Sequence, residues 1–292
     1  MTLLKLDNFS IIYPHFSIKN FNLSVGRNEI IVLAGKNGSG KTTIIESMIG
    51  IRRKAKGKLY FENKMYEISA LPVDVKKRIY LYSEDLPYFP DFSIIENLKY
   101  FAKLHDKKPD SKYFEMLMKK SGLTDYNKKY DSLSKGMKQR VSLLELMIIT
   151  PEVVLMDEPT IGLDPAGKMD LISLISGIKD GSSDILGGVI ATNDLDVIEK
   201  YATKTIFISE GNIILYGDFK TILKQLDEKY FVVDITKLDV LNLDKLNDLE
   251  GIIISGTRML VPKKYEEAIK SKGYKIEEIE PADVFRVEDN GN

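Results

Sequence analysis

The chain lacks cysteine, which excludes disulfides, thiol catalysis and cysteine-ligated metals. It also lacks a charge excess: its formal net charge is −1, so nothing favours nucleic acid or an anionic membrane as a partner. Long apolar runs are missing too, since stretches such as EIIVLAG are far shorter than the roughly 18–20 residues that span a bilayer. The first residues, MTLLKLDNFS, show no secretory signal pattern. We therefore expect a cytoplasmic protein, and any membrane-spanning part would belong to another chain.

The composition that remains is that of a globular protein, with 43% hydrophobic and 29% charged residues. The length of 292 residues favours a main domain accompanied by a smaller one. Strand patterns fill residues 1–28, and later apolar runs such as EIIVLAG and EVVLMDE alternate with helical patterns. Parallel strands that alternate with helices predict a doubly wound α/β fold.

Two regions depart from this alternation. Residues 86–145 contain three stretches with helical spacing of apolar residues, which we interpret as a helical insert. After residue 220, the order strand, helix, strand, strand, helix, strand fits a small ferredoxin-like α+β unit. The predicted domains are therefore 1–220, which includes the insert, and an accessory domain at 221–292.

The stretch GKNGSGKTT, residues 35–43, stands between a buried strand pattern and a helical pattern and fits G-x-x-x-x-G-K-[ST]. Its glycines let the backbone turn tightly and point N–H groups at phosphate oxygens, beside the positive end of the helix. Lys41 is expected to neutralise the β- and γ-phosphates, and the Thr42 hydroxyl to bind Mg²⁺. The nucleotide-binding residues predicted in this loop are Gly35, Asn37, Gly38, Ser39, Gly40, Lys41, Thr42 and Thr43.

A second apolar strand, in VVLMDEPT at residues 153–160, ends in two carboxylates. A fold with a phosphate loop needs an aspartate to hold Mg²⁺, and we assign that role to Asp157. Glu158 is then placed to polarise the water that attacks the γ-phosphate. A carboxylate suits this task because phosphoryl transfer mainly needs positioning and charge compensation.

A third motif, LSKGMKQR at residues 133–140, precedes the acidic strand. Together with GKNGSGKTT and VVLMDEPTIGLDP it resembles the ATP-binding subunit of ABC transporters over residues 1–220. P-loop kinases and GTPases lack the middle motif. The resemblance implies ATP and Mg²⁺ as cofactors. It also implies a P-loop NTPase (RecA-like) core with an N-terminal antiparallel β subdomain and a helical insert.

The middle motif matches the family pattern Leu-Ser-Gly-Gly-Gln except at Lys135 and Met137, and it retains Ser134 and Gly136. In the family these residues open a helix whose N–H groups and hydroxyl face an ATP held by a second subunit. The resemblance therefore implies a head-to-tail dimer of ATPase subunits that encloses two nucleotides.

Two further positions have two interpretations each. Asp164 matches the loop that crosses the dimer interface, and it is equally suited to cap the helix that begins at Pro165. Tyr13, or less favourably Phe16, matches the aromatic residue that stacks on adenine. The alternative for Tyr13 is a partly buried strand residue.

Two catalytic positions depart from the family. Glu84 stands where the family usually has glutamine; it can reach Mg²⁺ or the attacking water, but it cannot donate a hydrogen bond while ionised. Asn193 stands where the family usually has a histidine that binds the γ-phosphate. An asparagine can donate one amide hydrogen bond but is never cationic. We therefore predict slow basal hydrolysis.

The predicted function is ATP hydrolysis that powers a membrane transporter, with the chain peripheral on the inner face of the membrane. The motif LSKGMKQR and the ending EIEPADVF resemble ATPase subunits of drug, antibiotic or bacteriocin exporters. A coupling helix of the membrane subunit would dock on the insert, where the aromatics of LPYFPDFSIIENL either line the dock or pack the insert. The alternatives are an ABC ATPase acting on ribosomes or nucleic acid, and a weakly hydrolytic partner in a heterodimer. The cargo, the identity of the dimer partner and the role of 221–292 stay open.

Overall fold

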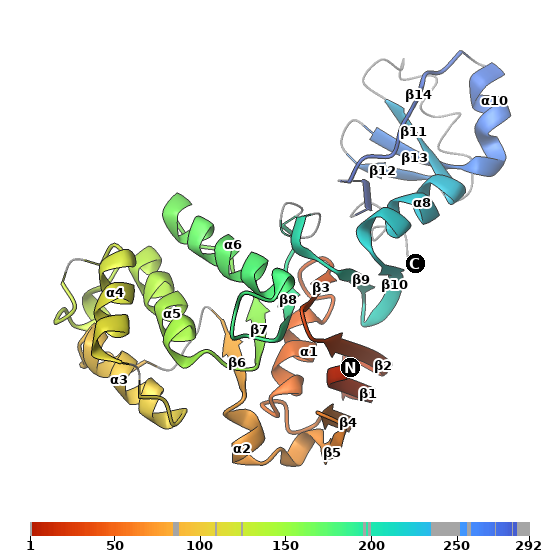
Figure 1. The fold of residues 1–292 in the computed structure, drawn as a ribbon. Coiled ribbons are helices and arrows are strands. Elements are labelled where there is room, and N and C mark those ends of the chain that lie inside the picture. The colour runs from red at the N-terminus through yellow and green to blue at the C-terminus, as the bar shows by residue number, and fades with distance from the viewer. Residues whose placement is uncertain are drawn as a thin grey trace.

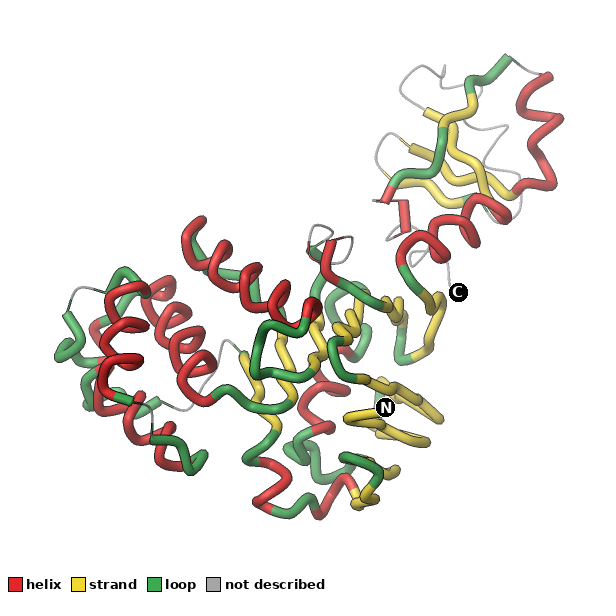
Figure 2. The backbone as a smooth tube through the Cα atoms, viewed as in Figure 1, coloured by secondary structure: helices red, strands yellow, loops and turns green. Residues whose placement is uncertain are grey.

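A computed structural model describes residues 2–83, 88–108, 110–123, 125–194, 197, 200–234, 252–255, 258–271, 273–281 and 283–284. It contains three sheets, and Figures 1 and 2 show the helical insert and the C-terminal unit at opposite ends of the molecule. Within these described ranges, no helix combines the length and the apolar character needed to cross a bilayer.

The central sheet has six strands, and all are parallel except the edge strand β10. In spatial order the strands are β10 (Asn212–Gly217), β9 (Lys204–Ser209), β3 (Glu29–Ala34), β8 (Gly187–Ala191), β7 (Val153–Asp157) and β6 (Ile79–Tyr82). The central strand β3 is buried along almost its whole length, which explains its continuous apolar sequence. The carboxyl ends of β3, β7 and β8 therefore lie at one edge of the sheet, where α/β proteins bind ligands.

Helices cover both faces of this sheet. Alternate residues of β3 pack on opposite sides: Ile31 lies in one core cluster with residues of α1 (Lys41–Met48). Ile30 lies in another, with residues of α5 (Lys135–Ile149) and α6 (Pro165–Asp180). The three-layer arrangement confirms the predicted doubly wound core.

The N-terminal strands form a separate antiparallel sheet, as predicted. Its order is β2 (Phe16–Gly26), β1 (Thr2–Tyr13), β4 (Lys56–Phe61) and β5 (Lys64–Glu67). The turn between β4 and β5 has Glu62 and Asn63 at φ 49° and 69°, as a two-residue hairpin turn requires. The short elements η1 (Ile68–Ala70) and α2 (Val73–Lys76) connect this sheet to β6.

The helical insert contains α3 (Ile94–Leu104), α4 (Ser111–Lys120), η2 (Tyr130–Ser132) and α5, and it has an apolar cluster of its own. Ser93 and Glu96 form a capping box that starts α3. The aromatic stretch packs the insert in part, and its role in a dock stays a prediction. Tyr88 is buried, with its ring 4.6 Å from that of Tyr130, whereas the exposed rings of Phe89 and Phe92 stack on each other at 4.8 Å.

The C-terminal unit follows a helix that sequence patterns did not predict, α8 (Phe219–Lys229). Its sheet has the antiparallel order β12 (Ile253–Ser255), β13 (Arg258–Pro262), β11 (Tyr230–Asp234) and β14 (Ile276–Glu277), with η4 (Lys263–Tyr265) and α10 (Glu266–Ser271) beside it. This is the strand order of a ferredoxin-like unit; the helix expected between β11 and β12 lies outside the described residues. Ile222 and Leu226 of α8 pack in the core of the main domain, so the predicted boundary at residue 220 falls inside a helix.

Candidate functional site

The phosphate loop leaves β3 at Gly35, where only glycine fits. Gly35 has φ +155°, and a Cβ atom there would lie 2.2 Å from the carbonyl oxygen of Ile208. Gly38 and Gly40 have φ of +87° and +112°, values that favour glycine. A Cβ on Gly40 would also lie 2.6 Å from the Phe16 ring. The glycine spacing seen in the sequence is therefore required by this backbone path.

The loop forms one wall of a cleft of about 500 Å³, a volume that suits a nucleotide-sized ligand. The cleft is lined by Phe16, Lys36, Asn37, Gly38, Gly40, Lys41, Thr42, Thr43, Glu46, Ile51, Leu81, Ser83, Asp157, Glu158 and Ile161. Six of the eight nucleotide-binding residues predicted in the phosphate loop, all but Gly35 and Ser39, thus line one cleft with the two predicted carboxylates. Glu46 was not predicted, although its position four residues after Thr42 on α1 puts both on one helix face.

Lys41 is buried at the base of this cleft. Its ammonium group donates to the carbonyl oxygen of Gly35 and, at 3.2 Å, to that of Lys36. The same Nζ lies 3.6 Å from Oε1 of Glu158. The buried ammonium group of Lys41 therefore faces the predicted catalytic carboxylate across the cleft.

Asp157 ends strand β7 in a largely buried position. Burial raises its pKa, while a hydrogen bond from the Thr42 side chain and the charge of Lys41 lower it. Its buried Oδ1 atom has no hydrogen-bond partner within the described part of the chain. An unpaired carboxylate oxygen beside a threonine hydroxyl is the donor set that Mg²⁺ prefers, so these residues fit the ion.

Glu158 follows directly in a strained backbone conformation. Its φ of 44° is left-handed, which is uncommon for a residue with a side chain. The backbone holds this conformation through two hydrogen bonds, from Glu158 N–H to the Ala191 carbonyl at 2.8 Å and from Ile161 N–H to the Glu158 carbonyl at 3.1 Å. The turn directs the carboxylate into the cleft, where it faces Lys41.

Asn193 lies two residues after β8, beside the start of the phosphate loop. Its side chain is exposed and is not among the residues that line the cleft. The side-chain oxygen Oδ1 accepts a hydrogen bond of 3.3 Å from the Gly35 N–H. The predicted contact with a γ-phosphate stays a prediction, and the observed partner is the loop itself.

The middle motif lies away from this cleft, at the start of α5. Ser134 is the N-cap of the helix, and its hydroxyl accepts a hydrogen bond of 3.3 Å from Met137 N–H. Gly136 lies in the first turn, where an added Cβ would be 3.4 Å from the Gly162 carbonyl oxygen. Ser134 is exposed and Gly136 partly exposed, so within one chain this motif and the phosphate loop form separate sites.

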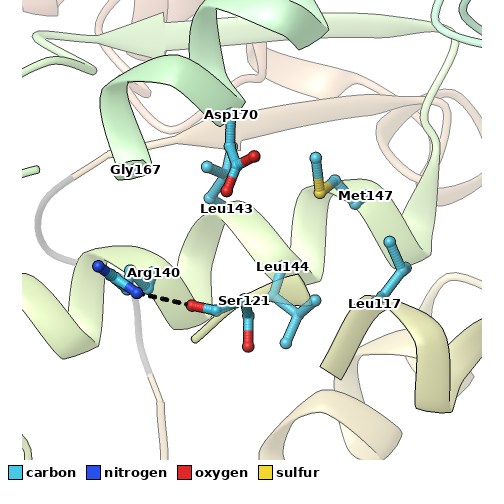
Figure 3. A pocket seen from close by; sticks show the side chains of 8 residues that line it. All are labelled: Leu117, Ser121, Arg140, Leu143, Leu144, Met147, Gly167 and Asp170. Carbon is cyan, nitrogen blue, oxygen red and sulfur yellow. Dashed lines mark hydrogen bonds between the residues drawn. The ribbon is translucent and has the colours of Figure 1, made fainter. Parts of the chain in front are cut away.

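Asp164 caps α6, as one of its two interpretations predicted. Its side chain accepts a hydrogen bond of 2.9 Å from Gly167 N–H, and Pro165 follows at the first helical position. A further partner, Arg140 of α5, was not predicted: it forms an ion pair with Asp164 and donates at 2.8 Å to the Ser121 carbonyl. Figure 3 shows Arg140 directed at Ser121, with Gly167 on a neighbouring element.

Other predicted site residues have different outcomes. Phe16 lines the cleft, whereas Tyr13 does not; the Tyr13 side chain is half-buried and lies near Arg52. Which aromatic residue meets adenine stays a prediction. Glu84 lies outside the described residues, and its neighbour Ser83 lines the cleft.

A buried polar cluster lies where the insert meets the core, and sequence patterns gave no sign of it. The Tyr80 hydroxyl of β6 donates to Oε1 of Glu145 on α5 at 2.9 Å. Burial raises the pKa of Glu145 to about 7, and the neighbouring hydroxyl groups of Tyr88 and Tyr80 lower it. Tyr88 belongs to the insert, so side chains from three segments surround this carboxyl group.

Comparisons with known proteins agree with this site. Residues 18–161 match the family model described as ABC transporter. The chain is 27% identical to the energy-coupling factor transporter ATP-binding protein EcfA2 of Clostridium perfringens, over 76% of this chain and 80% of that protein. It is 27% identical to the phosphate import ATP-binding protein PstB of Thermotoga maritima, over 78% of this chain and 96% of that protein. It is 29% identical to the lantibiotic transport ATP-binding protein SrtF of Streptococcus pyogenes, over 74% of this chain and 91% of that protein.

A solved ATP-binding subunit of an ABC transporter shares the fold, with a TM-score of 0.66 at 23% identity over 77% of this chain and 93% of that one. The three motifs, their positions at the ends of β3, β7 and α5, and these relatives lead to one conclusion. The chain belongs to the ABC transporter family as one of its ATP-binding, ATP-hydrolysing subunits.

Proposed function

We propose that this chain hydrolyses Mg·ATP in the cleft between the phosphate loop and the end of β7, and that its turnover drives a membrane exporter. The observation that carries the site assignment is the convergence of Lys41, Asp157 and Glu158, with Lys41 Nζ 3.6 Å from Glu158 Oε1. Phosphoryl transfer needs positioned charges more than covalent chemistry, and these three groups supply them.

Each group has a distinct role in this proposal. The loop N–H groups and Lys41 bind the phosphates, and Thr42 with Asp157 holds Mg²⁺, which supplies charge compensation at the γ-phosphate when bound. Glu158 orients the attacking water and accepts its proton. The left-handed backbone of Glu158 fixes the direction of its carboxylate before substrate arrives.

The decisive experiment replaces the Glu158 carboxylate by an amide of the same shape. Glu158→Gln should bind ATP but turn over at least about 100-fold more slowly, the usual contribution of a general base. Glu67→Gln, at an exposed position on β5, is the matched control and should keep the full rate. Unchanged turnover in Glu158→Gln would contradict the catalytic assignment.

The exposed end of α5 supports a head-to-tail dimer. Ser134 and Gly136 present a helix N-terminus that does not line the chain's own cleft, and such an end suits the γ-phosphate of a second subunit. Closure on ATP would then be driven by contacts that only the phosphates supply. In size-exclusion chromatography Glu158→Gln should dimerise with Mg·ATP and not with Mg·ADP. The same fraction of dimer with and without ATP would contradict this part of the proposal.

A groove between the core and the insert supports docking of a membrane subunit. It has a volume of about 390 Å³ and includes three aliphatic side chains that are unusually exposed, Ile51, Val73 and Leu104 at 52%, 68% and 50%. With Phe89 and Phe92 nearby on the insert, this apolar surface suits an amphipathic helix of another chain. Co-purification with ribosomes or nucleic acid instead of membranes would favour the alternative function.

The export direction rests on sequence likeness. The motif LSKGMKQR and the ending EIEPADVF resemble exporter subunits, and SrtF of lantibiotic transport is a relative; PstB of phosphate import is the counterexample. Transport assays with the assembled complex test the direction, and uptake would overturn it. The departures at Glu84 and Asn193 support slow basal turnover, either in a pair of identical chains or beside a more active partner.

A further inference from the structure

We infer that Asn193 is a positioning residue of the phosphate loop, whose side-chain oxygen takes the place of a main-chain acceptor and holds Gly35 in register with β8. The inference deepens the proposed function and rests on its placement of nucleotide in the cleft. It differs from a γ-phosphate contact, because the group that Asn193 binds belongs to the loop.

The sheet itself explains why a side chain is needed here. Strands β3 and β8 pair in parallel as far as Leu33 and Ala191, and Thr192 N–H still donates to the Leu33 carbonyl at 3.0 Å. In a regular parallel ladder the next bond would run from Gly35 N–H to the Thr192 carbonyl. Gly35 N–H donates instead to Oδ1 of Asn193 at 3.3 Å. The asparagine therefore extends the ladder by one bond, at the point where the loop leaves the sheet.

Gly35 is the residue through which this bond reaches the loop. Its N–H is held by Asn193, and its carbonyl accepts from the Lys41 ammonium. A Cβ at Gly35 would lie 2.7 Å from the Ser39 hydroxyl, so the loop folds back closely on this residue. The position of Gly35 thus affects Lys41 and the loop N–H groups together. These groups are the ones expected to bind the phosphates that ATP and ADP share.

The chemistry of an amide suits this position better than the alternatives. An aspartate would accept the same hydrogen bond but would add a negative charge beside the phosphate site. An alanine would leave the Gly35 N–H without this partner. Because Oδ1 is engaged by Gly35, the orientation of the amide is fixed, and the side chain lies outside the residues that line the cleft.

The first experiment compares ATP with ADP. Asn193→Ala should weaken the binding of both nucleotides by the same factor, about two- to tenfold, which is what loss of one hydrogen bond produces. The matched control is Asn212→Ala in an exposed hairpin, which should change neither affinity. Weaker binding of ATP alone would identify a γ-phosphate contact and overturn the inference, as would no change for either nucleotide.

The second experiment needs no nucleotide. In hydrogen-exchange measurements on the free chain, the Gly35 amide should exchange faster in Asn193→Ala by about threefold or more, and it should stay protected in Asn193→Asp, which keeps the acceptor. Equal thermal midpoints would show that both variants are folded. Unchanged exchange in Asn193→Ala would overturn the inference by itself. A wild-type chain that binds neither ATP nor ADP would instead overturn the proposed function.

Discussion

In the proposed dimer, the nucleotide cleft and the exposed end of α5 carry the two halves of one reaction, and the two regions are built in different ways. The cleft gathers its charged groups at the ends of buried parallel strands, so Lys41, Asp157 and Glu158 lie in contact range within one chain. The end of α5 offers an exposed Ser134 and a partly exposed Gly136, and neither is among the described residues that line the cleft.

The difference indicates which part of the activity a single chain can perform. Nucleotide binding depends on the cleft, which is lined mainly by the ends of central-sheet strands and by the loop and helix that follow β3. Turnover in the proposed dimer also depends on the α5 end, which is fixed to the insert and to the loop before α6 through Arg140 and Asp164. Variants in the two regions should therefore separate nucleotide affinity from rate.

The largest effect is expected within the cleft. Lys41→Ala removes the buried ammonium and should weaken ATP binding by about tenfold to 100-fold, since hydrogen bonds to charged groups are the strong ones. Lys119→Ala, an exposed lysine of the insert, is the control. Titration with a fluorescent ATP analogue measures the change. Affinity within twofold of wild type would show that the loop binds phosphate without this side chain.

The next effect should fall on rate alone. Gly136→Asp places a carboxylate in the first turn of α5, where it favours the helix but repels a partner's phosphates. Turnover should fall about tenfold or more, while ATP affinity of the isolated chain stays within twofold. Steady-state rates and equilibrium titration are measured in parallel. Loss of affinity would mean that the two regions form one site within the chain.

A third prediction concerns the junction between the insert and the core, where Glu145 lies. The pKa of Glu145 is about 7 in the folded chain, above its unfolded value of about 4.5, so the folded state holds this proton more tightly. Its contribution to stability is complete below pH 4.5 and is lost as pH rises through 7. Glu145→Gln should remove this loss, and its thermal midpoint should fall less than that of wild type between pH 5 and pH 8. Between these two pH values, wild type should lose about 1–3 kcal/mol more unfolding free energy than the variant. Thermal midpoints that change equally with pH in Glu145→Gln and in wild type would contradict the raised pKa of Glu145.

The smallest effect is expected at Arg140. Arg140→Ala breaks the link from α5 to Asp164 and to the Ser121 carbonyl, but both ion-pair partners are partly exposed, and such pairs contribute little. Turnover should fall by at most about fivefold, with ATP affinity unchanged. Arg140→Lys should recover less than half of the loss, because lysine lacks the planar fork that reaches both partners. A drop as large as that of Gly136→Asp would make Arg140 part of the site itself.

Much of this architecture could be predicted because it depends on local patterns. The apolar run of β3, the glycine spacing and the acidic end of β7 are each short patterns, and they predicted the strands and the turn that the structure contains together with candidate site residues. Asp164 as a helix cap followed from Pro165 in the same way. The helix α8 was missed although its sequence carries a helix pattern: Asp218 is its N-cap, and its apolar residues Phe219, Ile222, Leu223 and Leu226 have helical spacing.

Contacts between distant segments were not predictable from these patterns. The partner of Asn193 depends on the register of β3 against β8, and the ion pair of Arg140 depends on how α5 packs on the loop before α6. The raised pKa of Glu145 likewise needs three elements to enclose one carboxyl group. Such contacts determine the orientation and the charge state of these side chains, and neither property follows from the residue type alone.

The place of β3 in the sheet also has a consequence for how the chain folds. Ile31 pairs with Val189 on one side and with Lys204 on the other. During synthesis, the phosphate loop and its strand emerge long before either neighbouring strand exists. Non-local pairing of this kind folds slowly and leaves an apolar edge exposed meanwhile. The nascent chain should therefore depend on chaperone protection until residues past 204 have left the ribosome.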